Sequence, residues 1–264
     1  MSDSIHNADR LSISIDVAAD SDIGLIRPSN QDVAMVYLFP EAPSYALLAV
    51  ADGMGGHRAG HLASRLATEA LLGYVQTLLD GDDGLDHIPP PPELLKQAVH
   101  VANQAVRQYA SVHREEAGDM GSTLTCALIA DTMVTIANVG DSRAYHFSNG
   151  LLYQVTQDHS LVAELVRRGE LPPEAILLHP QRNIITRALG MEDDVQPDIW
   201  IRQLEPGDWL LLCSDGLWEM VPEDHIASIL ESSHNAAMAV RRLIDAANER
   251  GGLDNIGVAV ARLW

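Results

Sequence analysis

Three aspartates stand at the ends of apolar segments that are predicted to form strands, each beside a glycine or an asparagine. They are Asp52 before Gly53, Asp215 before Gly216, and Asp254 before Asn255. A buried strand holds its terminal residue in a fixed place, as a metal ligand requires. A neighbouring glycine lets the backbone carbonyl and a metal ion approach each other closely. The pattern therefore indicates a cation site built from scattered aspartates.

Carboxylate and carbonyl oxygens select hard cations, so magnesium or manganese is expected at such a site in preference to zinc. Two such ions about 3.5–4 Å apart can hold a shared hydroxide and clamp a phosphoryl group. An Asp-Gly pair is also an ordinary turn sequence. Three acidic strand ends fit a turn less well than one would, but spacing alone leaves both interpretations open.

Other candidate sites in the chain lack a necessary component. His57 and His61 could share a helix face, but without a third ligand two partly exposed histidines are favoured over a zinc site. Ser122 and Ser214 have no histidine-aspartate partner pattern, so hydrogen bonds in turns explain them better than a nucleophilic role. The glycine-rich segment 53–56 lacks the lysine of a phosphate-binding loop, and nucleotide binding is not indicated.

The chain of 264 residues is strongly acidic, with 17 Lys and Arg against 37 Asp and Glu and a formal net charge of −20. This charge repels nucleic acid and anionic membrane surfaces, so neither is expected as a partner. The apolar content of 47% is enough for a sizeable core. No apolar stretch is long enough to span a membrane.

Two further features favour the cytoplasm. Cys126 and Cys213 both lie in apolar runs, which predicts buried free thiols and fits a reducing compartment. Residues 1–10 are polar and acidic, so they do not form a signal peptide. We therefore expect a cytoplasmic protein, and we expect a monomer.

Hydrophobic periodicity predicts the elements of the first half of the chain. Residues 1–10 are expected to be a disordered tail. Alternation and short apolar runs predict strands, and apolar residues at helical spacing predict two helices. The strands are at 12–17, 32–39 and 45–51, and the helices at about 57–79 and 94–109. Two glycines and four consecutive prolines make residues 81–92 a surface loop rather than a helix.

In the second half the pattern changes to that of short strands. Asn149-Gly150 between two of them is a hairpin turn sequence, because both residues tolerate positive φ. Residues 158–195, with a short helix at 161–168, are predicted to form an irregular flap. The remaining predicted elements are strands at 122–130, 133–139, 143–147 and 151–155, a strand pair at 199–204 and 208–213, helices at 222–230 and 235–248, and a final strand at 256–263.

Sequential hairpins predict antiparallel sheets rather than a parallel βαβ array. The two early helices and the two late ones would cover a sandwich of such sheets, which gives an α+β fold. No internal repeat or linker divides the chain, so residues 11–264 are predicted to form one domain.

Short motifs match those of a known family, in the family's order, over about residues 20–262. They are Ser21-Asp22-Ile23-Gly24, Arg27-Pro28-Ser29-Asn30-Gln31-Asp32, Val50-Ala51-Asp52-Gly53-Met54-Gly55-Gly56, Gly121-Ser122-Thr123-Leu124, Asn138-Val139-Gly140-Asp141-Ser142-Arg143, Thr156-Gln157-Asp158-His159-Ser160, Arg187-Ala188-Leu189-Gly190, Ser214-Asp215-Gly216-Leu217 and Asp254-Asn255-Ile256. Each motif is weak by itself, but the ordered set is specific. The chain resembles the type 2C serine/threonine phosphatases, the metal-dependent protein phosphatase family, in its bacterial form.

The resemblance implies a fold and a set of metal ligands. The fold would be an αββα sandwich, in which two antiparallel sheets pack face to face with helices on both outer sides. Asp52 would bridge two manganese or magnesium ions, and the Gly53 carbonyl would bind one of them. Asp215 and Asp254 would hold the other ion. Asp119, just before Gly121, matches the aspartate that supports a third, weaker ion.

The resemblance also implies roles around the metals. Arg27 would bind the substrate phosphate through its forked donors, and Asp32 would order metal-bound water from behind the ligands. Eukaryotic members carry a histidine where this chain has Met54, so a metal-bound water, or more weakly His57, would be the proton donor. Gln31 stands where the family usually has glutamate, which removes a negative charge from the site.

The implied activity is hydrolysis of phosphoserine and phosphothreonine in proteins by a metal-bridging hydroxide, without a covalent phosphoenzyme. Substrates would include a serine/threonine kinase of a signalling pathway or that kinase's targets, and the flap at about 158–195 would select among them. The alternative is a catalytically silent relative that binds phosphoproteins as a regulatory module. Gln31 alone favours that alternative. The argument against it is that the chain retains Asp52, Asp119, Asp215, Asp254 and Arg27.

Overall fold

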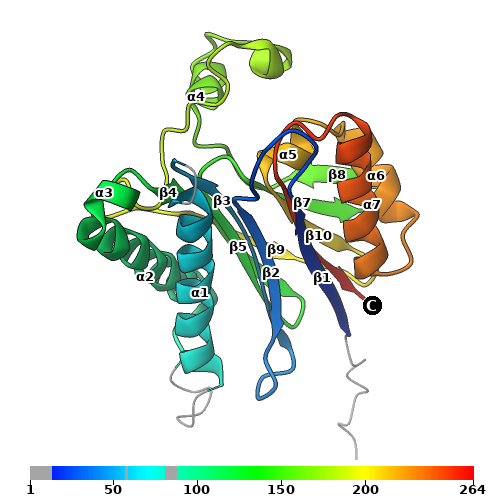
Figure 1. The fold of residues 1–264 in the computed structure, drawn as a ribbon. Coiled ribbons are helices and arrows are strands. Elements are labelled where there is room, and N and C mark those ends of the chain that lie inside the picture. The colour runs from blue at the N-terminus through cyan, green and yellow to red at the C-terminus, as the bar shows by residue number, and fades with distance from the viewer. Residues whose placement is uncertain (1–13, 57–58, 81–87) are drawn as a thin grey trace, which may run out of the picture.

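The computed structural model describes residues 14–56, 59–80 and 88–264. Two antiparallel sheets pack face to face, and helices cover both outer sides (Figure 1). The expected α+β sandwich is confirmed. The predicted tail at residues 1–10 and much of the predicted loop at 81–92 lie outside the described residues. In the part of the chain that is described, no helix is both long and apolar enough to cross a membrane.

The first sheet brings together strands from both ends of the chain. Its order is β1-β11-β10-β7-β8, and each neighbouring pair is antiparallel. The strands are β1 (Ile15–Asp22), β7 (Arg143–Ser148), β8 (Leu151–Gln154), β10 (Trp209–Cys213) and β11 (Ile256–Leu263). The hairpin between β7 and β8 turns at Asn149 and Gly150, both at positive φ, as predicted.

The second sheet has the order β2-β3-β5-β6-β9, with the short strand β4 pairing to the end of β3. Its strands are β2 (Asp32–Leu38), β3 (Tyr45–Met54), β4 (Gly121–Ser122), β5 (Leu124–Ala130), β6 (Met133–Val139) and β9 (Asp198–Gln203). The strands β3 and β5 are buried almost throughout because helices cover one face and the first sheet covers the other.

Each layer boundary contains its own apolar core. One core lies between the second sheet and the helices α1 (Ala59–Leu79) and α2 (Pro91–Val112), which leads into α3 (Arg114–Ala117). A second core lies between the first sheet and the late helices, and a third lies between the two sheets. The late helices are α5 (Asp215–Trp218), α6 (Glu223–Glu231) and α7 (Ala236–Glu249).

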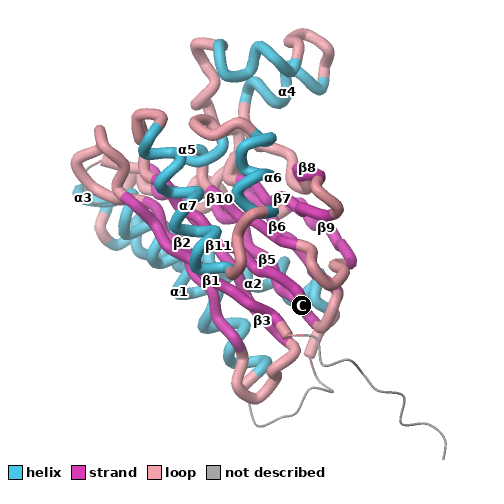
Figure 2. The backbone as a smooth tube through the Cα atoms, turned by 90° about the vertical axis from the view of Figure 1, so that its right-hand side faces the viewer, coloured by secondary structure: helices cyan, strands magenta, loops and turns pink. Residues whose placement is uncertain are grey.

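The segment 158–195 contains α4 (Leu161–Arg167) and a 3-10 helix (Pro173–Leu178). Both views place these two helices beyond the strand ends, at one end of the sandwich (Figure 1, Figure 2). Closer to its end the segment returns to the sandwich, where the buried Leu189 pairs with Ser122 of β4. The first turn of α1 and the end of β3 lie at the same end of the molecule (Figure 1).

Three sequence predictions of secondary structure are wrong in detail. Pro91 and Pro92 begin α2 rather than ending a loop, because proline at the first turn of a helix removes no intrahelical hydrogen bond. The strands β9 and β10 do not pair with each other. β9 joins β6 in the second sheet, and β10 joins β7 and β11 in the first, so residues 204–208 cross between sheets. The first strand runs from Ile15 to Asp22 rather than from 12 to 17.

Candidate metal centre

Asp32 and Asp52 face each other across β2 and β3, directly opposite in the register of the antiparallel pair. Like charges at such a position repel each other. Asp32 is buried, and its Oδ2 accepts a hydrogen bond of 2.6 Å from the Ser214 hydroxyl. Ser214 therefore links this carboxylate to the end of β10 in the other sheet.

Burial raises the pKa values of these two carboxyl groups. The pKa of Asp32 rises to about 7, with the charge of Asp254 adding to the effect of burial and the Ser214 hydrogen bond opposing it. The pKa of Asp52 rises well above its usual value, because burial is reinforced by the charges of Asp32 and Asp215. A nearby cation would reverse both shifts, since an opposite charge favours the ionised carboxylate.

Asp215 and Asp254 reach the same cluster from the first sheet. Asp215 follows β10 as the first residue of α5, and Asp254 precedes β11. A Cβ added at Gly216 would lie 1.9 Å from the Asn255 carbonyl oxygen, so only glycine permits this approach of the two segments. Burial and then the charges of Asp141 and Asp254 raise the pKa of Asp215 well above its usual value.

Arg27 lies at the mouth of the cluster. Its guanidinium donates to Asp254 Oδ2 at 2.5 Å, and its side chain is half exposed. The hydrogen bond to Asp254 raises the pKa of Arg27 most, against a smaller opposing effect of burial, and the charges of Asp215 and Asp52 raise it further. The arginine is therefore the cation that partly neutralises the cluster in this structure.

The Gly53 carbonyl and the Gln31 amide meet at the start of α1. A Cβ added at Gly60 would lie 2.6 Å from the Gly53 carbonyl oxygen and 2.8 Å from Gln31 Oε1. The Gly53 amide donates to the Gln31 carbonyl at 3.1 Å, and the Ser64 hydroxyl donates to the same oxygen at 2.6 Å. These contacts hold two neutral oxygens beside the acidic cluster.

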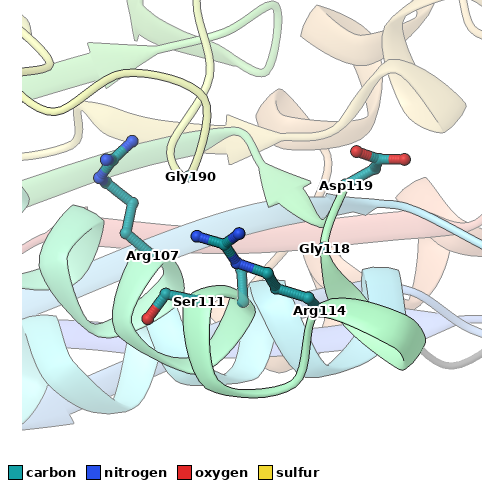
Figure 3. A pocket seen from close by; sticks show the side chains of 7 residues that line it. Arg107, Ser111, Arg114, Gly118, Asp119 and Gly190 are labelled. Carbon is teal, nitrogen blue, oxygen red and sulfur yellow. The ribbon is translucent and has the colours of Figure 1, made fainter.

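Asp119 stands apart from the buried carboxylates. It is exposed and lines a cleft next to α2 and α3 (Figure 3). The chain continues from it into β4, where Gly121 pairs with Met54 at the end of β3. The structure thus places Asp119 at the edge of the site, apart from the buried aspartates.

Asp141 belongs to the cluster, although the sequence analysis did not select it. Burial raises its pKa to about 7, with the charge of Asp158 adding to the effect. Its Oδ1 is buried and accepts no hydrogen bond from any described residue. The Trp218 indole donates to its backbone carbonyl at 3.1 Å and so fixes the residue. Asp141 could have been found in the sequence from its position just after the apolar strand β6. It was not selected because its glycine, Gly140, precedes the aspartate, whereas the selected aspartates are followed by glycine or asparagine.

The donor set fits hard cations. An unpaired buried carboxylate oxygen and several mutually repelling aspartates are costly without a positive charge nearby. Among the described residues, however, no three His, Cys, Asp or Glu side chains converge closely enough to enclose one ion by themselves. Backbone oxygens such as that of Gly53 would have to complete the coordination, as is usual for these cations.

Comparison with known proteins finds a family model and relatives that cover most of the chain. The family model described as "Protein phosphatase 2C" matches residues 28–248. The serine/threonine phosphatase stp of Listeria monocytogenes is 41% identical over 241 residues, covering 90% of this chain and 92% of that protein.

Solved structures match as well. The serine/threonine phosphatase PstP/Ppp of Mycobacterium tuberculosis is similar with a TM-score of 0.82 and 38% identity, covering 94% of this chain and 98% of that one. The catalytic domain of the protein phosphatase PstP in complex with two manganese ions is similar with a TM-score of 0.81 and 36% identity, covering 96% of this chain and 99% of that one.

Proposed function

The chain belongs to the protein phosphatase 2C family and is a metal-dependent serine/threonine protein phosphatase, and on this premise we propose a role for each residue of its acidic cluster. Asp52 and the Gly53 carbonyl hold one of two ions, manganese or magnesium. Asp52 would also be a ligand of the second ion, and Asp215 and Asp254 would complete the coordination of that ion. Asp141, with its unpaired buried oxygen, stands close enough to Asp215 to share in that second site.

One observation carries this assignment: burial and the charges of Asp32, Asp141 and Asp254 raise the pKa values of Asp52 and Asp215, although these five residues come from separate strands and both sheets. A fold that gathers like charges in its interior needs a compensating cation. When bound, the two ions lower the pKa of water for attack at neutral pH and neutralise charge on the phosphoryl group.

Arg27 binds the substrate phosphate. Its bidentate fork suits a phosphoryl group, and its half-exposed position above the cluster lets it reach one. In the structure it donates instead to Asp254. A metal ion at Asp254 would weaken the attraction between Asp254 and Arg27, and the guanidinium would then be available to bind substrate.

The remaining residues tune the site. Asp32, held by Ser214, orders water next to the ions. The proton donor to the leaving alkoxide is a water of the metal site, while the weaker candidate, His57, lies outside the described residues. Asp119 supports a third, weaker ion at the edge of the site.

The substrates are phosphoserine and phosphothreonine proteins, including a serine/threonine kinase or that kinase's targets. Residues 11–264 act as one catalytic domain, with the segment 158–195 as a flap over substrate. The two cysteines are free and buried, as predicted. Free thiols fit the cytoplasm, where we place the protein.

Release of phosphate from a phosphothreonine peptide and from a small aryl phosphate tests the proposal. We expect no turnover after chelation, recovery with manganese, and loss of at least about a thousandfold in Asp52→Asn, since ion and nucleophile depend on that carboxylate. Asp20→Asn, an exposed change in β1, is the matched control. Full turnover by protein shown by elemental analysis to contain no metal would refute the mechanism. A chain that binds phosphopeptide but never hydrolyses it would instead be the silent relative.

A further inference from the structure

A cleft of about 420 Å³ lies at the corner where α2 runs into α3 (Figure 3). The chain turns there at His113, between the two helices. The cleft is lined by Arg107, Ala110, Ser111, Arg114, Gly118, Asp119 and Gly190. None of these residues has a place in the metal chemistry except Asp119, at the edge nearest the site.

The cleft is close to the reaction centre. Asp119 is three residues before Ser122, and Ser122 pairs with Gly53 across β4 and β3. Gly121, two residues after Asp119, pairs with Met54. Two residues of chain span at most about 7 Å and paired strands lie about 5 Å apart, so the cleft begins within about 12 Å of the segment that carries Gly53. An extended peptide advances about 3.3–3.6 Å per residue. A substrate side chain two to four residues from the phosphorylated one would therefore reach it.

Two arginines give the cleft a positive charge that is unusual in a chain with 17 basic and 37 acidic residues. Arg107 near the end of α2 and Arg114 at the start of α3 both line the cleft. Their guanidinium groups point into the cleft, whereas the Asp119 carboxylate points away from them (Figure 3). The side chain of Arg114 is exposed and makes no hydrogen bond or ion pair with any described residue.

Arg107 has one acidic partner, and that partner is exchangeable. Its guanidinium pairs with Asp193, whose side chain is 91% exposed. The buried Asn103 side chain fixes the backbone at Asp193, because it donates hydrogen bonds to the carbonyl oxygens of Glu192 and Asp193. Exposed ion pairs contribute only about 0–1 kcal/mol, so an incoming anion can compete for Arg107.

Backbone glycines keep the cleft open. Gly190 has φ of +90°, and a Cβ there would lie 2.7 Å from the Met120 carbonyl oxygen and 2.9 Å from Val106 Cγ1. Its amide donates to Asn103 Oδ1 at 2.8 Å. The wall facing the arginines is thus fixed, and it adds no side chain to fill the space.

We propose that this cleft binds an anionic side chain of the substrate, a carboxylate or a second phosphate, two to four residues from the phosphoserine or phosphothreonine being hydrolysed. The inference rests on the proposed function and adds a substrate class to it. The arginine pair offers donors to one anion, and it provides attraction that the acidic remainder of the surface does not. The phosphatase is thereby selective for phosphosites in acidic surroundings.

Steady-state kinetics with a series of phosphothreonine peptides tests the proposal. The peptides share one sequence and carry alanine, aspartate or a non-hydrolysable phosphonate residue at each position from two to four on either side. We expect kcat/KM to be about two- to fivefold higher with an anion at the favoured position, because exposed charged contacts are modest. The aspartate and phosphonate arms show which anion is preferred. The gain should shrink in 0.5 M salt.

Variants separate a direct contact from a structural effect. Arg114→Gln and Arg107→Gln should abolish the preference, and Asp193→Asn should increase it by removing the competing carboxylate. The matched control is Arg241→Gln on α7, an exposed arginine with an acidic partner in the opposite helical layer. Turnover of the small aryl phosphate, which is too short to reach the cleft, should stay unchanged in all four variants.

Equal kcat/KM for all peptides in the wild-type protein would overturn the proposal, and so would a preference that survives in Arg107→Gln and Arg114→Gln. Failure of the proposed function looks different: no phosphopeptide would then be hydrolysed, whatever its flanking residues.

Discussion

Asp141 shows what a single carboxylate contributes to the acidic cluster. It adds more to the pKa of Asp215 than any other charge does, second only to burial. Its own Oδ1 finds no hydrogen bond among the described residues. A buried oxygen of this kind costs free energy until a cation arrives. Asp141 therefore destabilises the metal-free protein and stabilises the metal-bound form relative to it.

Replacing Asp141 with asparagine should separate these two effects. We expect about ten- to a hundredfold more manganese to be needed for half-maximal activity, the usual effect of losing a residue beside a metal ligand. The melting temperature in chelator should rise, because one of several repelling charges is gone. Asp20→Asn should change neither quantity. A manganese titration curve that coincides with that of the wild type would exclude Asp141 from the metal site.

Gln31 stands where the resemblance to the family implies a glutamate. Its Oε1 lies beside the Gly53 carbonyl at the first turn of α1, where an added charge would act on the proposed metal ligand. Gln31→Glu should lower the manganese concentration for half-maximal activity by roughly ten- to a hundredfold. We expect the wild type to be activated better by manganese than by magnesium, and Gln31→Glu should reduce this difference. Superimposable titrations of both proteins would show that residue 31 takes no part in holding metal.

At the scale of elements, the sequence predicted most strands and helices, because hydrophobic periodicity is local. The strand β6, the strand β11 and the hairpin at Asn149-Gly150 agree with prediction. Which strand pairs with which is not local, and there the prediction failed for β9 and β10. The turn at 205–207 looks like a hairpin turn, yet it carries the chain from one sheet to the other.

The candidate site shows the same limit. Asp52, Asp215 and Asp254 were selected because each precedes a glycine or asparagine at the end of an apolar segment. Asp141 was missed because its glycine precedes it, and only the fold reveals that its charge acts on Asp215. The closeness of Arg27 to Asp254, 227 residues later in the chain, has no local signal either.

The contact between α5 and the start of β11 sets the spacing of Asp215 and Asp254. Gly216→Ala would place a Cβ 1.9 Å from the Asn255 carbonyl oxygen, so the two elements must move apart. We expect destabilisation of about 1–3 kcal/mol, as for other overpacked sites, and a higher manganese requirement. Urea unfolding and manganese titration measure both.

Gly73→Ala is the matched control for that change. Gly73 lies inside α1 with open space where a Cβ would be added, and alanine there should stabilise the protein by roughly 0.5–1 kcal/mol. A Gly216→Ala protein as stable as the wild type, with the same metal requirement, would mean that α5 and β11 do not set the spacing of the ligands.

The whole molecule carries its excess acid in two places, the exposed surface and the buried cluster. Exposed carboxylates keep the surface solvated. In the cluster, burial raises the pKa values of Asp32 and Asp141 to about 7 and those of Asp52 and Asp215 well above their usual range. Between about pH 4 and 7 the folded chain without metal therefore binds more protons than the unfolded chain does.

Linkage fixes the sign of the effect on stability. A carboxyl group whose folded pKa lies above its unfolded value stabilises the fold at low pH, and this stabilisation is lost as pH rises through the folded pKa. The metal-free protein should thus lose stability as the pH rises from about 4 to 7. Metal ions must displace the same protons, so their stabilising effect should grow over the same interval.

Thermal unfolding at pH 5.5 and 7.5, in chelator and in manganese, tests this sign. In chelator we expect a higher melting temperature at pH 5.5, and in manganese a larger upward shift at pH 7.5. Reduced surface repulsion near the sequence pI of about 4.7 also favours the lower pH.

Asp141→Asn separates the two causes, because it leaves the surface intact and removes one titrating group from the cluster. Its melting temperature in chelator should fall less between pH 5.5 and 7.5 than that of the wild type. An equal fall in both proteins would assign the pH dependence to the surface and leave the buried cluster without a part in it.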